Sequence, residues 1–336
     1  MKLSNVSDLA RLQTMQRQAF TTRASLDRAG LEMTTGKKAS PFEAAGGDLT
    51  RLFGLERALE RNAVFSDTLS LTEMRLEVTQ EAFGRVLGPV QTLATDLLSS
   101  AGLGDLSAGR IHADAARRAF SGVFAVLNTR VAGQALFAGT ATDRDAVAPS
   151  ETVLAELDAL AAGAATASDA ITAIEEYFAR PAGGFYVTGY LGSTTDLNPV
   201  EVGDGQRLDA AVRADADEIV SMLRAHALGA VVAGGAFAGD RDSQLQILRA
   251  SGERMLQAKD DVLALRARVG ASQNAVEQAR AGRTAEREAL ELARAKIVAV
   301  DPLEAASTYQ TLQVQLESVY MVTSRLSTLR FSNYMR

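Results

Sequence analysis

The chain has 336 residues and a formal net charge of -6, from 41 Asp and Glu against 35 Lys and Arg. This acidic balance argues against nucleic acid or a membrane as the main partner, because both attract a basic surface. Cysteine is absent, which excludes disulfides, thiol nucleophiles and cysteine-ligated metals. With no tryptophan and 5% aromatic residues, we expect the aliphatic, alanine-rich core typical of helical bundles.

The first predicted helix runs over about residues 6–35 and stops at Gly36. Apolar or small residues recur along it at steps of three and four, which forms a seam that a second helix must cover. An isolated helix of this length is marginal in water, so the pattern predicts a helical partner. The seam consists of Leu12, Met15, Ala19, Thr22, Leu26, Ala29 and Met33.

A second helix is predicted from Ser40, because an N-cap serine, Pro41 and Glu43 together form a start signal. We expect it to kink at Gly88 and Pro89, where proline removes one backbone hydrogen bond. A third helix should follow over about 107–131. The seam of the second helix has one residue every seven positions: Leu55, Asn62, Leu69, Leu76, Phe83, Val90 and Leu97.

Heptads are absent between Gly133 and Asp240, where Ala, Gly, Thr and Asp become frequent. Short helices are predicted over 153–160 and 170–178, strands over 185–187 and 200–202, a hairpin turn over 203–205, and a helix over 208–232. We expect this part to form a small α+β insertion. We also expect the long helices to close their core without it.

From Ser243 the heptad pattern returns and continues to Val300, broken only by Arg283 and Glu286. At ~1.5 Å per residue, the helix from Leu248 to Val300 would be roughly 80 Å long. Asp301 and Pro302 then open the last helix. Its seam repeats the spacing of the first: Ala305, Tyr309, Leu312, Leu316, Val319, Thr323 and Leu326.

These elements predict a mainly α fold, an elongated antiparallel helical bundle or coiled coil with a small α+β insertion at its tip. The predicted inner coiled-coil domain comprises residues 1–36 and 301–336. The long-helix bundle comprises residues 37–133 and 241–300, and the outer insertion comprises residues 134–240. Because both terminal segments need a helical partner, the pattern is typical of an assembly protein.

No catalytic, cofactor or metal constellation is found in the sequence, so we expect neither an enzyme nor a bound cofactor. We interpret His112 and His226 as ordinary helix residues, because two histidines without cysteine cannot build a usual structural zinc site. Asp215, Asp217 and Glu218 lie at spacings that point to different helix faces. They are interpreted as a solvated helix surface.

Three stretches resemble the flagellar hook–filament junction proteins (hook-associated protein 3) of the bacterial flagellin superfamily. The first is Thr35-Gly36-Lys37-Lys38 followed by Ser40-Pro41, and the second is Gly133 to Thr140 (GQALFAGT). The third is the carboxyl end, with Asp301-Pro302, Tyr309-Gln310, Gln315-Leu316-Glu317-Ser318 and Asn333-Tyr334. The chain departs from the family at Phe42-Glu43-Ala44-Ala45, where a Ser-Asp-Asp-Pro-like run is usual. It also has Ala146-Val147 and Pro149 where a Pro-Phe pair often follows the second stretch.

The resemblance implies a structural subunit that polymerises through its terminal helices between hook-associated protein 1 and flagellin. It further implies a homo-oligomeric ring, contact with the flagellar export apparatus and an export chaperone, and a place in the extracellular flagellum. Residues 1–17 hold no apolar run of the length that a cleavable signal needs, which fits export without one. The expected assembly residues are Leu12, Met15, Leu26, Met33, Leu312, Leu316, Val319, Leu326 and Leu329.

Two other functional hypotheses fit the pattern of terminal helices. A flagellin-like filament subunit should polymerise alone into fibres, whereas a junction protein should need a hook end. A cytosolic coiled-coil adaptor unrelated to flagella should have folded, paired terminal helices as a free protein. The absence of an Ala-Gln-Ala-Asn run near the carboxyl end favours the junction protein over the filament subunit.

Overall fold

The computed structural model describes residues 3–203 and 205–334, and side-chain environments for these except 3–9, 11–12, 203, 206 and 326–334. The chain folds into two compact units. Unit 1 comprises Met1–Ala63 and Thr284–Arg336, and unit 2 comprises Val64–Arg283. The predicted mainly α class is confirmed, because helices dominate and the strands form only two small sheets. No helix in the described part of the chain is long and apolar enough to cross a membrane.

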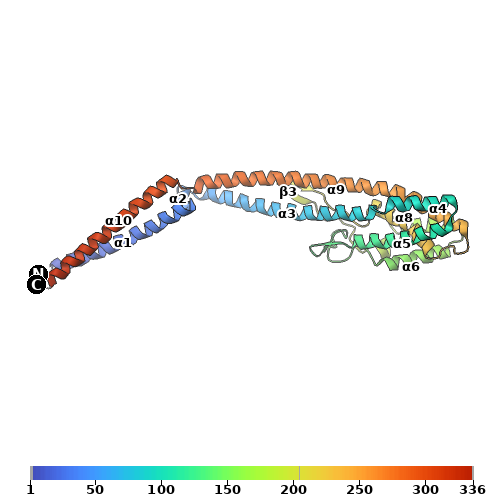
Figure 1. Ribbon diagram of the computed structural model, residues 1–336, viewed down its shortest axis with the longest axis horizontal. Coiled ribbons are helices and arrows are strands. Elements are labelled where there is room, and N and C mark those ends of the chain that lie inside the picture. Colours follow the sequence, from blue (N-terminus) through green and yellow to red (C-terminus); the bar gives the residue numbers. More distant parts are fainter. Residues whose placement is uncertain (1–2, 204, 335–336) are drawn as a thin grey trace. The chain divides into compact units, whose positions relative to one another are not determined.

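Unit 1 contains two terminal helices and the ends of two longer ones (Figure 1). Helix α1 (Leu3–Thr35) ends as predicted where Gly36 adopts a positive φ of 67°. The start signal at Ser40 builds only the short α2 (Pro41–Ala44), because Gly46 and Gly47 turn the chain with positive φ. The predicted continuous helix is therefore wrong here, and a new helix, α3 (Thr50–Leu87), begins after the turn. The long α9 (Arg241–Val298) leads into α10 (Pro302–Tyr334).

Unit 2 contains the remaining helices and both sheets. Gly88 and Pro89 separate α3 from the next helix, so the sequence located the interruption correctly. The predicted helices over 107–131, 153–160 and 170–178 are found close to their expected bounds. The elements are α4 (Val90–Leu103), α5 (Leu106–Leu127), β1 (Arg130–Val131), β2 (Gln134–Ala135), α6 (Ser150–Gly163), α7 (Ala167–Tyr177), the π-helix η1 (Phe185–Gly189), β3 (Val200–Gly203), β4 (Gln206–Leu208) and α8 (Asp217–Ala233).

The core of unit 2 depends on α8. Twelve of its seventeen residues are buried, including Met222, Leu223 and Leu228, and the helix packs against α5. Gly229 is needed at this contact, because a Cβ there would lie 2.6 Å from that of Ala116 on α5. In the structure the long helices do not close this core by themselves, since α8, which lies within residues 134–240, belongs to the same core as α5 and the first part of α9.

The segment from Gly133 to Thr140 holds the non-helical part of unit 2 in place through a buried side chain and backbone contacts. Phe137 is fully buried, and its carbonyl accepts a hydrogen bond from the Ala214 amide at 2.9 Å. Gly139 adopts a φ of 60°, and a Cβ there would lie 2.5 Å from the Thr195 carbonyl oxygen. This stretch therefore needs its glycine for both backbone conformation and space.

Two expected elements differ in kind. Residues 185–187, predicted as a strand, begin the π-helix η1, in which Phe185 packs against Phe178 with ring centroids 5.4 Å apart. The helix predicted from residue 208 begins at Asp217, because polar contacts of Asp215 hold the preceding residues in an irregular, non-helical path. The hairpin of β3 and β4 is confirmed, with Val200 opposite Leu208 and Glu201 opposite Arg207.

The polar break in the heptads of α9 has matching residues on α3. In unit 1, the Asn62 side-chain amide donates a hydrogen bond to Glu286 Oε2 at 3.1 Å, and Asn62 is buried. In unit 2, the Arg283 guanidinium lies 5.4 Å from the centroid of the Phe65 ring. Arg283 and Glu286, the two residues that interrupt the apolar series, therefore each contact a specific residue of α3.

Candidate assembly surface

The terminal helices α1 and α10 pack along each other in unit 1, as their two seams predict (Figure 1). Ala29 and Ala305 are buried between them, and the small side chains allow a close approach of the two backbones. The Tyr309 ring lies over Gly30, where a Cβ would come within 3.3 Å of Tyr309 Cε2. Thr22 is also buried on this seam.

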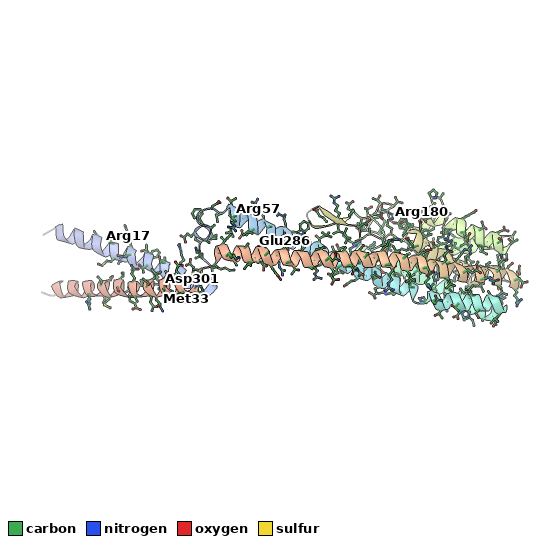
Figure 2. All side chains as sticks on the ribbon, turned by 90° about the horizontal axis from the view of Figure 1, so that it is seen from above. Arg17, Met33, Arg57, Arg180, Glu286 and Asp301 are labelled. Carbon is green, nitrogen blue, oxygen red and sulfur yellow. The ribbon has the colours of Figure 1, made fainter. Side chains whose placement is uncertain are left out.

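The predicted assembly residues divide into three groups. Met15, Leu26, Leu312, Leu316 and Val319 are half-buried along the α1/α10 pair. Met33 is more exposed, at 44% of its surface, because it lies in the last turn of α1 before the chain leaves the pair (Figure 2). The side chains of Leu12, Leu326 and Leu329 lie outside the described part of the structure. The assembly function of all nine residues stays a prediction.

A second set of apolar side chains on the same two helices is exposed. Phe20 is 76% exposed and Val314 is 63% exposed, although both are large and apolar. Each helix therefore uses one face for its partner within the chain and leaves another apolar face in water. We call the exposed set the outer face: Phe20, Leu31, Leu303, Val314, Tyr320, Met321 and Val322.

Sequence reasoning missed the outer face because it followed only the seam residues. The signal was present: Val314 and Met321 are seven residues apart, which places them on one side of α10 two turns from each other. Gly30 was missed for a different reason, since a glycine inside a helix carries no apolar signal. Only the position of the Tyr309 ring shows that Gly30 provides space in the seam.

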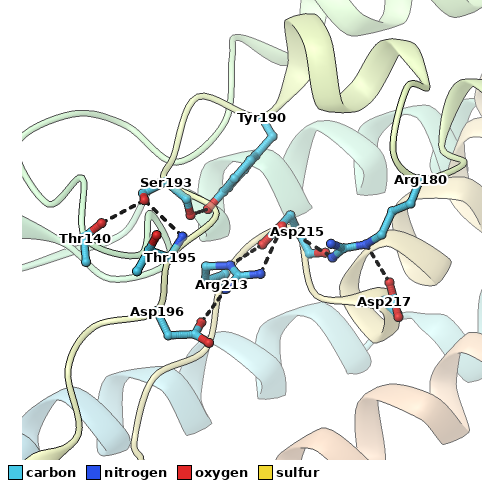
Figure 3. A network of polar contacts seen from close by, with 9 residues as sticks. All are labelled: Thr140, Arg180, Tyr190, Ser193, Thr195, Asp196, Arg213, Asp215 and Asp217. Carbon is cyan, nitrogen blue, oxygen red and sulfur yellow. Dashed lines mark hydrogen bonds and ion pairs between the residues drawn. The ribbon is translucent and has the colours of Figure 1, made fainter.

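Figure 3 shows the polar network of unit 2, which centres on Asp215. Arg213 donates two hydrogen bonds to the Asp215 carboxylate, at 2.7 and 3.2 Å, and a further one to Asp196 at 2.6 Å. Arg180 bonds Asp215 from the other side and donates to Asp217 at 3.0 Å. Hydrogen bonding by Asp215 raises the pKa of Arg213 above its usual value. Asp215 therefore holds two guanidinium groups in fixed positions.

This network corrects the interpretation of the acidic residues as a solvated helix surface. Asp215 is buried and precedes the helix, while Asp217 is exposed and Glu218 pairs with Arg268 at 2.6 Å. The buried charge is compensated by arginine, as a buried carboxylate requires. The arrangement holds the segment leading into α8 and presents no reactive group.

The two histidines lie apart from this network. His226 is fully buried in α8, where its Nδ1 hydrogen bonds the Met222 carbonyl at 2.8 Å. Burial lowers the pKa of His226 below 6.5. His112 is on α5, with Nδ1 3.9 Å from Asp96. Among the described residues, no group of three or more His, Asp or Glu side chains is placed to hold a metal ion.

Comparison with known proteins gives a match to a sequence family and similar folds among solved structures. The bacterial flagellin C-terminal helical region matches residues 253–334, which cover α9 from Glu253 onward and all of α10. Bacillus cereus FlgL superposes with a TM-score of 0.50 at 14% identity, over 72% of this chain and 100% of that chain. A protein described as a flagellar hook-associated protein from Vibrio parahaemolyticus has a TM-score of 0.50 at 13% identity, over 73% and 94%. Among curated proteins, no sequence matches the chain.

The chain is therefore flagellin-like over its carboxyl-terminal helical region. Its fold is similar to those of Bacillus cereus FlgL and the hook-associated protein from Vibrio parahaemolyticus, and together with the sequence match this confirms the resemblance seen in the sequence.

Proposed function

We propose that this chain is a structural, non-enzymatic subunit of the bacterial flagellum that forms the junction between hook-associated protein 1 and the flagellin filament. The observation that carries the proposal is the α1/α10 pair with its exposed outer face, of which α10 lies in the region that matches flagellin. Two helices bury only one side of each other, so a lateral partner is needed to cover the rest. Copies of the same chain in a ring would supply it.

The remaining partners follow from the same proposal. The subunit would leave the cell through the flagellar export apparatus without a cleaved signal, assisted by an export chaperone, and would function in the extracellular flagellum. Tyr320, Met321 and Val322 expose three consecutive large side chains on α10, which a monomer in water gains nothing by exposing. An assembled ring would remove them from water.

The test is complementation of a strain that lacks this gene. The double variant Val314→Glu/Met321→Glu places two charges on the outer face, and burying an unpaired charge costs several kcal/mol. We expect the variant to be exported but to leave filaments unattached, with flagellin shed into the medium. The matched control Thr311→Glu/Gln313→Glu changes two exposed polar residues of the same helix and should restore filaments.

Two outcomes of these experiments would contradict the proposed function. If the Val314→Glu/Met321→Glu variant attaches filaments as well as the wild-type chain, the outer face is not the assembly surface. If the wild-type chain polymerises alone into long fibres without hooks, the alternative of a flagellin-like filament subunit is correct. The sequence match to the flagellin C-terminal region is the observation that favours this alternative.

A further inference from the structure

Arg75 on α3 is a half-buried cation of unit 2 that pairs with no Asp or Glu among the described residues. Its Nη1 donates to Gln134 Oε1 at 3.3 Å, and this neutral acceptor leaves the positive charge uncompensated. Arg117, which is also half-buried in unit 2, has a carboxylate partner instead, since its Nη2 lies 2.8 Å from Asp158 Oδ2. Arg75 therefore lacks the counter-charge that a comparable arginine of the same unit has.

The pKa values of the two arginines shift in opposite directions. Burial lowers the pKa of Arg75 below its usual value, because desolvation disfavours the charged form. The hydrogen bond to Asp158 raises the pKa of Arg117 above its usual value. The charge of Arg75 is thus destabilised by its surroundings, and an anion beside it would remove this cost.

Arg75 lines a cavity of about 40 Å³ in unit 2, between α3 and the chain segments 197–200 and 210–212. Leu136, Val200 and Val212 contribute apolar walls, and the described residues that line the cavity include no Asp or Glu. A single water molecule needs roughly 10–15 Å³ of such a volume, so the cavity has space for about three groups of that size.

Polar groups at this cavity can still donate hydrogen bonds. The Asn198 side chain and the backbone amides of Ala210 and Val212 make no hydrogen bond to any part of the chain that the structure describes. The hydroxyls of Thr72 and Thr79 are already used, because each donates at 2.8 Å to a carbonyl of α3. The cavity thus combines one uncompensated cation with unused donors, which is the environment that an anion requires.

We propose that this cavity binds a small planar oxyanion of the size of formate, with the Arg75 guanidinium as its main ligand. A guanidinium presents its N–H groups in a fork that matches the two oxygens of a carboxylate, and the apolar walls strengthen the attraction by excluding water. The occupant is a free ion, because a carboxylate on a side chain would need space for its stem as well. The bound ion would connect α3 to residues 210–212. This inference goes beyond the flagellar assignment and does not depend on it.

The experiment compares urea unfolding of the full chain in sodium formate and in sodium methanesulfonate, at equal ionic strength and pH. Both anions are monovalent, but methanesulfonate has a larger, tetrahedral head that does not fit the cavity. For the transition of unit 2, we expect the folding equilibrium constant to rise saturably with formate, about tenfold at ten times the dissociation constant. Methanesulfonate should cause no such rise.

Three variants locate the effect. Arg75→Gln removes the charge, so it should be at least as stable as the wild-type chain without formate and should lose the response to formate. Arg75→Lys keeps the charge but not the fork, so it should respond only at higher formate concentrations. The matched control Arg85→Gln removes an exposed guanidinium of α3 that pairs with Glu81 at 2.6 Å, and it should respond as the wild-type chain does.

Three results would overturn the proposal. Equal responses of the wild-type chain to formate and methanesulfonate would show a general salt effect and no binding site. A response of Arg75→Gln equal to that of the wild-type chain would place the bound ion elsewhere. If Arg75→Gln does not fold, Arg75→Lys decides, since an unchanged half-saturating formate concentration would show that the guanidinium is not the main ligand.

Discussion

The turn between β1 and β2 places an alanine where most side chains are disfavoured. Ala132 has a φ of 51° and Gly133 a φ of 79°, which is the pattern of a two-residue hairpin turn with both central residues left-handed. Alanine in this region costs roughly 1–2 kcal/mol, whereas asparagine and glycine tolerate it. The Ala132 side chain is exposed and has no packing contact to lose.

We therefore expect Ala132→Asn to stabilise unit 2 by about 0.5–1 kcal/mol in urea unfolding followed by circular dichroism. Ala132→Val is the control with the opposite expected sign. A β-branched side chain is more strongly disfavoured at positive φ, so this variant should destabilise unit 2. A stabilising effect of Ala132→Val would show that strain at this turn does not limit stability.

His226 should make stability depend on pH. Its pKa in the folded protein lies below 6.5 because burial disfavours the charged ring. Among the described residues, Nε2 has no acceptor for the N–H that a second proton would create. The unfolded chain therefore binds a proton first as the pH falls. The free energy of unfolding should be highest above pH 6.5 and should decline below it, by at most about 1.4 kcal/mol per pH unit.

The measurement is the free energy of unfolding between pH 7.5 and 5.5. The variant His226→Met, which cannot be protonated, should remove most of the slope in this window. His112→Gln changes the other, less buried histidine and should leave the slope in place. Equal slopes for the wild-type chain and His226→Met would contradict the assignment.

At the scale of elements, the sequence predicted helices best where one period continues for many turns. The seam residues of α1 and α10 and the interruption at Gly88 and Pro89 are read directly from spacing and from the chemistry of proline. The assembly surface was predictable only for its seam. Its outer face could not be separated from ordinary surface residues without seeing which side of each helix the partner covers.

The non-helical elements were harder to predict because distant contacts decide them. Phe185-Tyr186-Val187 has the residue types of a strand, but the adjacent Gly183 and Gly184 lie against Tyr177 with no space for side chains, and this contact with α7 fixes the path of the chain into the π-helix. The segment before α8 stays non-helical because Arg180, 35 residues earlier in the chain, contacts Asp215, and Arg213 bridges Asp215 to Asp196. Spacing within one helix contains no information on such pairs.

The α1/α10 pair should be the least stable pair of long helices in the free chain. Most of its seam is only half-buried, and ordering the backbone costs roughly 1–2 kcal/mol per residue. We expect amide exchange in residues 12–33 and 312–326 to be much faster than in residues 262–276 of α9, where Val262, Leu265 and Val269 are buried. Equal protection in the monomer would refute folding coupled to assembly.

Gly30 gives the same pair a specific weak point. Gly30→Leu would force the Tyr309 ring away from α1, since even a Cβ comes within 3.3 Å of it. We expect a loss of helical signal and faster exchange in α1 and α10 only. Ala24→Leu, an exposed position on the same helix, should leave both unchanged. A fully helical Gly30→Leu chain with normal amide exchange would show that the α1/α10 seam can rearrange to accommodate a large side chain at residue 30.

At the scale of the whole molecule, the two units differ in what stabilises them. The large apolar core lies entirely within unit 2, from Leu69 to Val276. Residues 64–283 expressed alone should therefore fold and unfold in one cooperative transition. Replacing residues 134–240 by a short linker should instead abolish folding, because it removes α8.

Removing residues 134–240 should abolish folding because the burial lost with α8 is large compared with the total stability. Burial of a single Leu, Ile, Val or Met side chain contributes about 1.5–3 kcal/mol, and α8 buries several, against a typical total stability of about 5–15 kcal/mol. Urea unfolding of the two shortened chains tests both expectations. A stable chain without residues 134–240 would restore the view of that region as a removable insertion.

The matched polar residues on α3 and α9 have a consequence for alignment. A stripe that repeats every seven residues lets one helix slide along another by a heptad with leucine still facing leucine. The Asn62–Glu286 contact joins residues 224 positions apart and has one register only. A slip of one heptad would place Asn62 opposite Ala293 and Glu286 opposite Leu69, and leaving the buried Asn62 unpaired would cost about 1–3 kcal/mol. The Asn62–Glu286 contact thus distinguishes the correct register of α3 and α9 from registers shifted by whole heptads, although the two helices are far apart in the sequence.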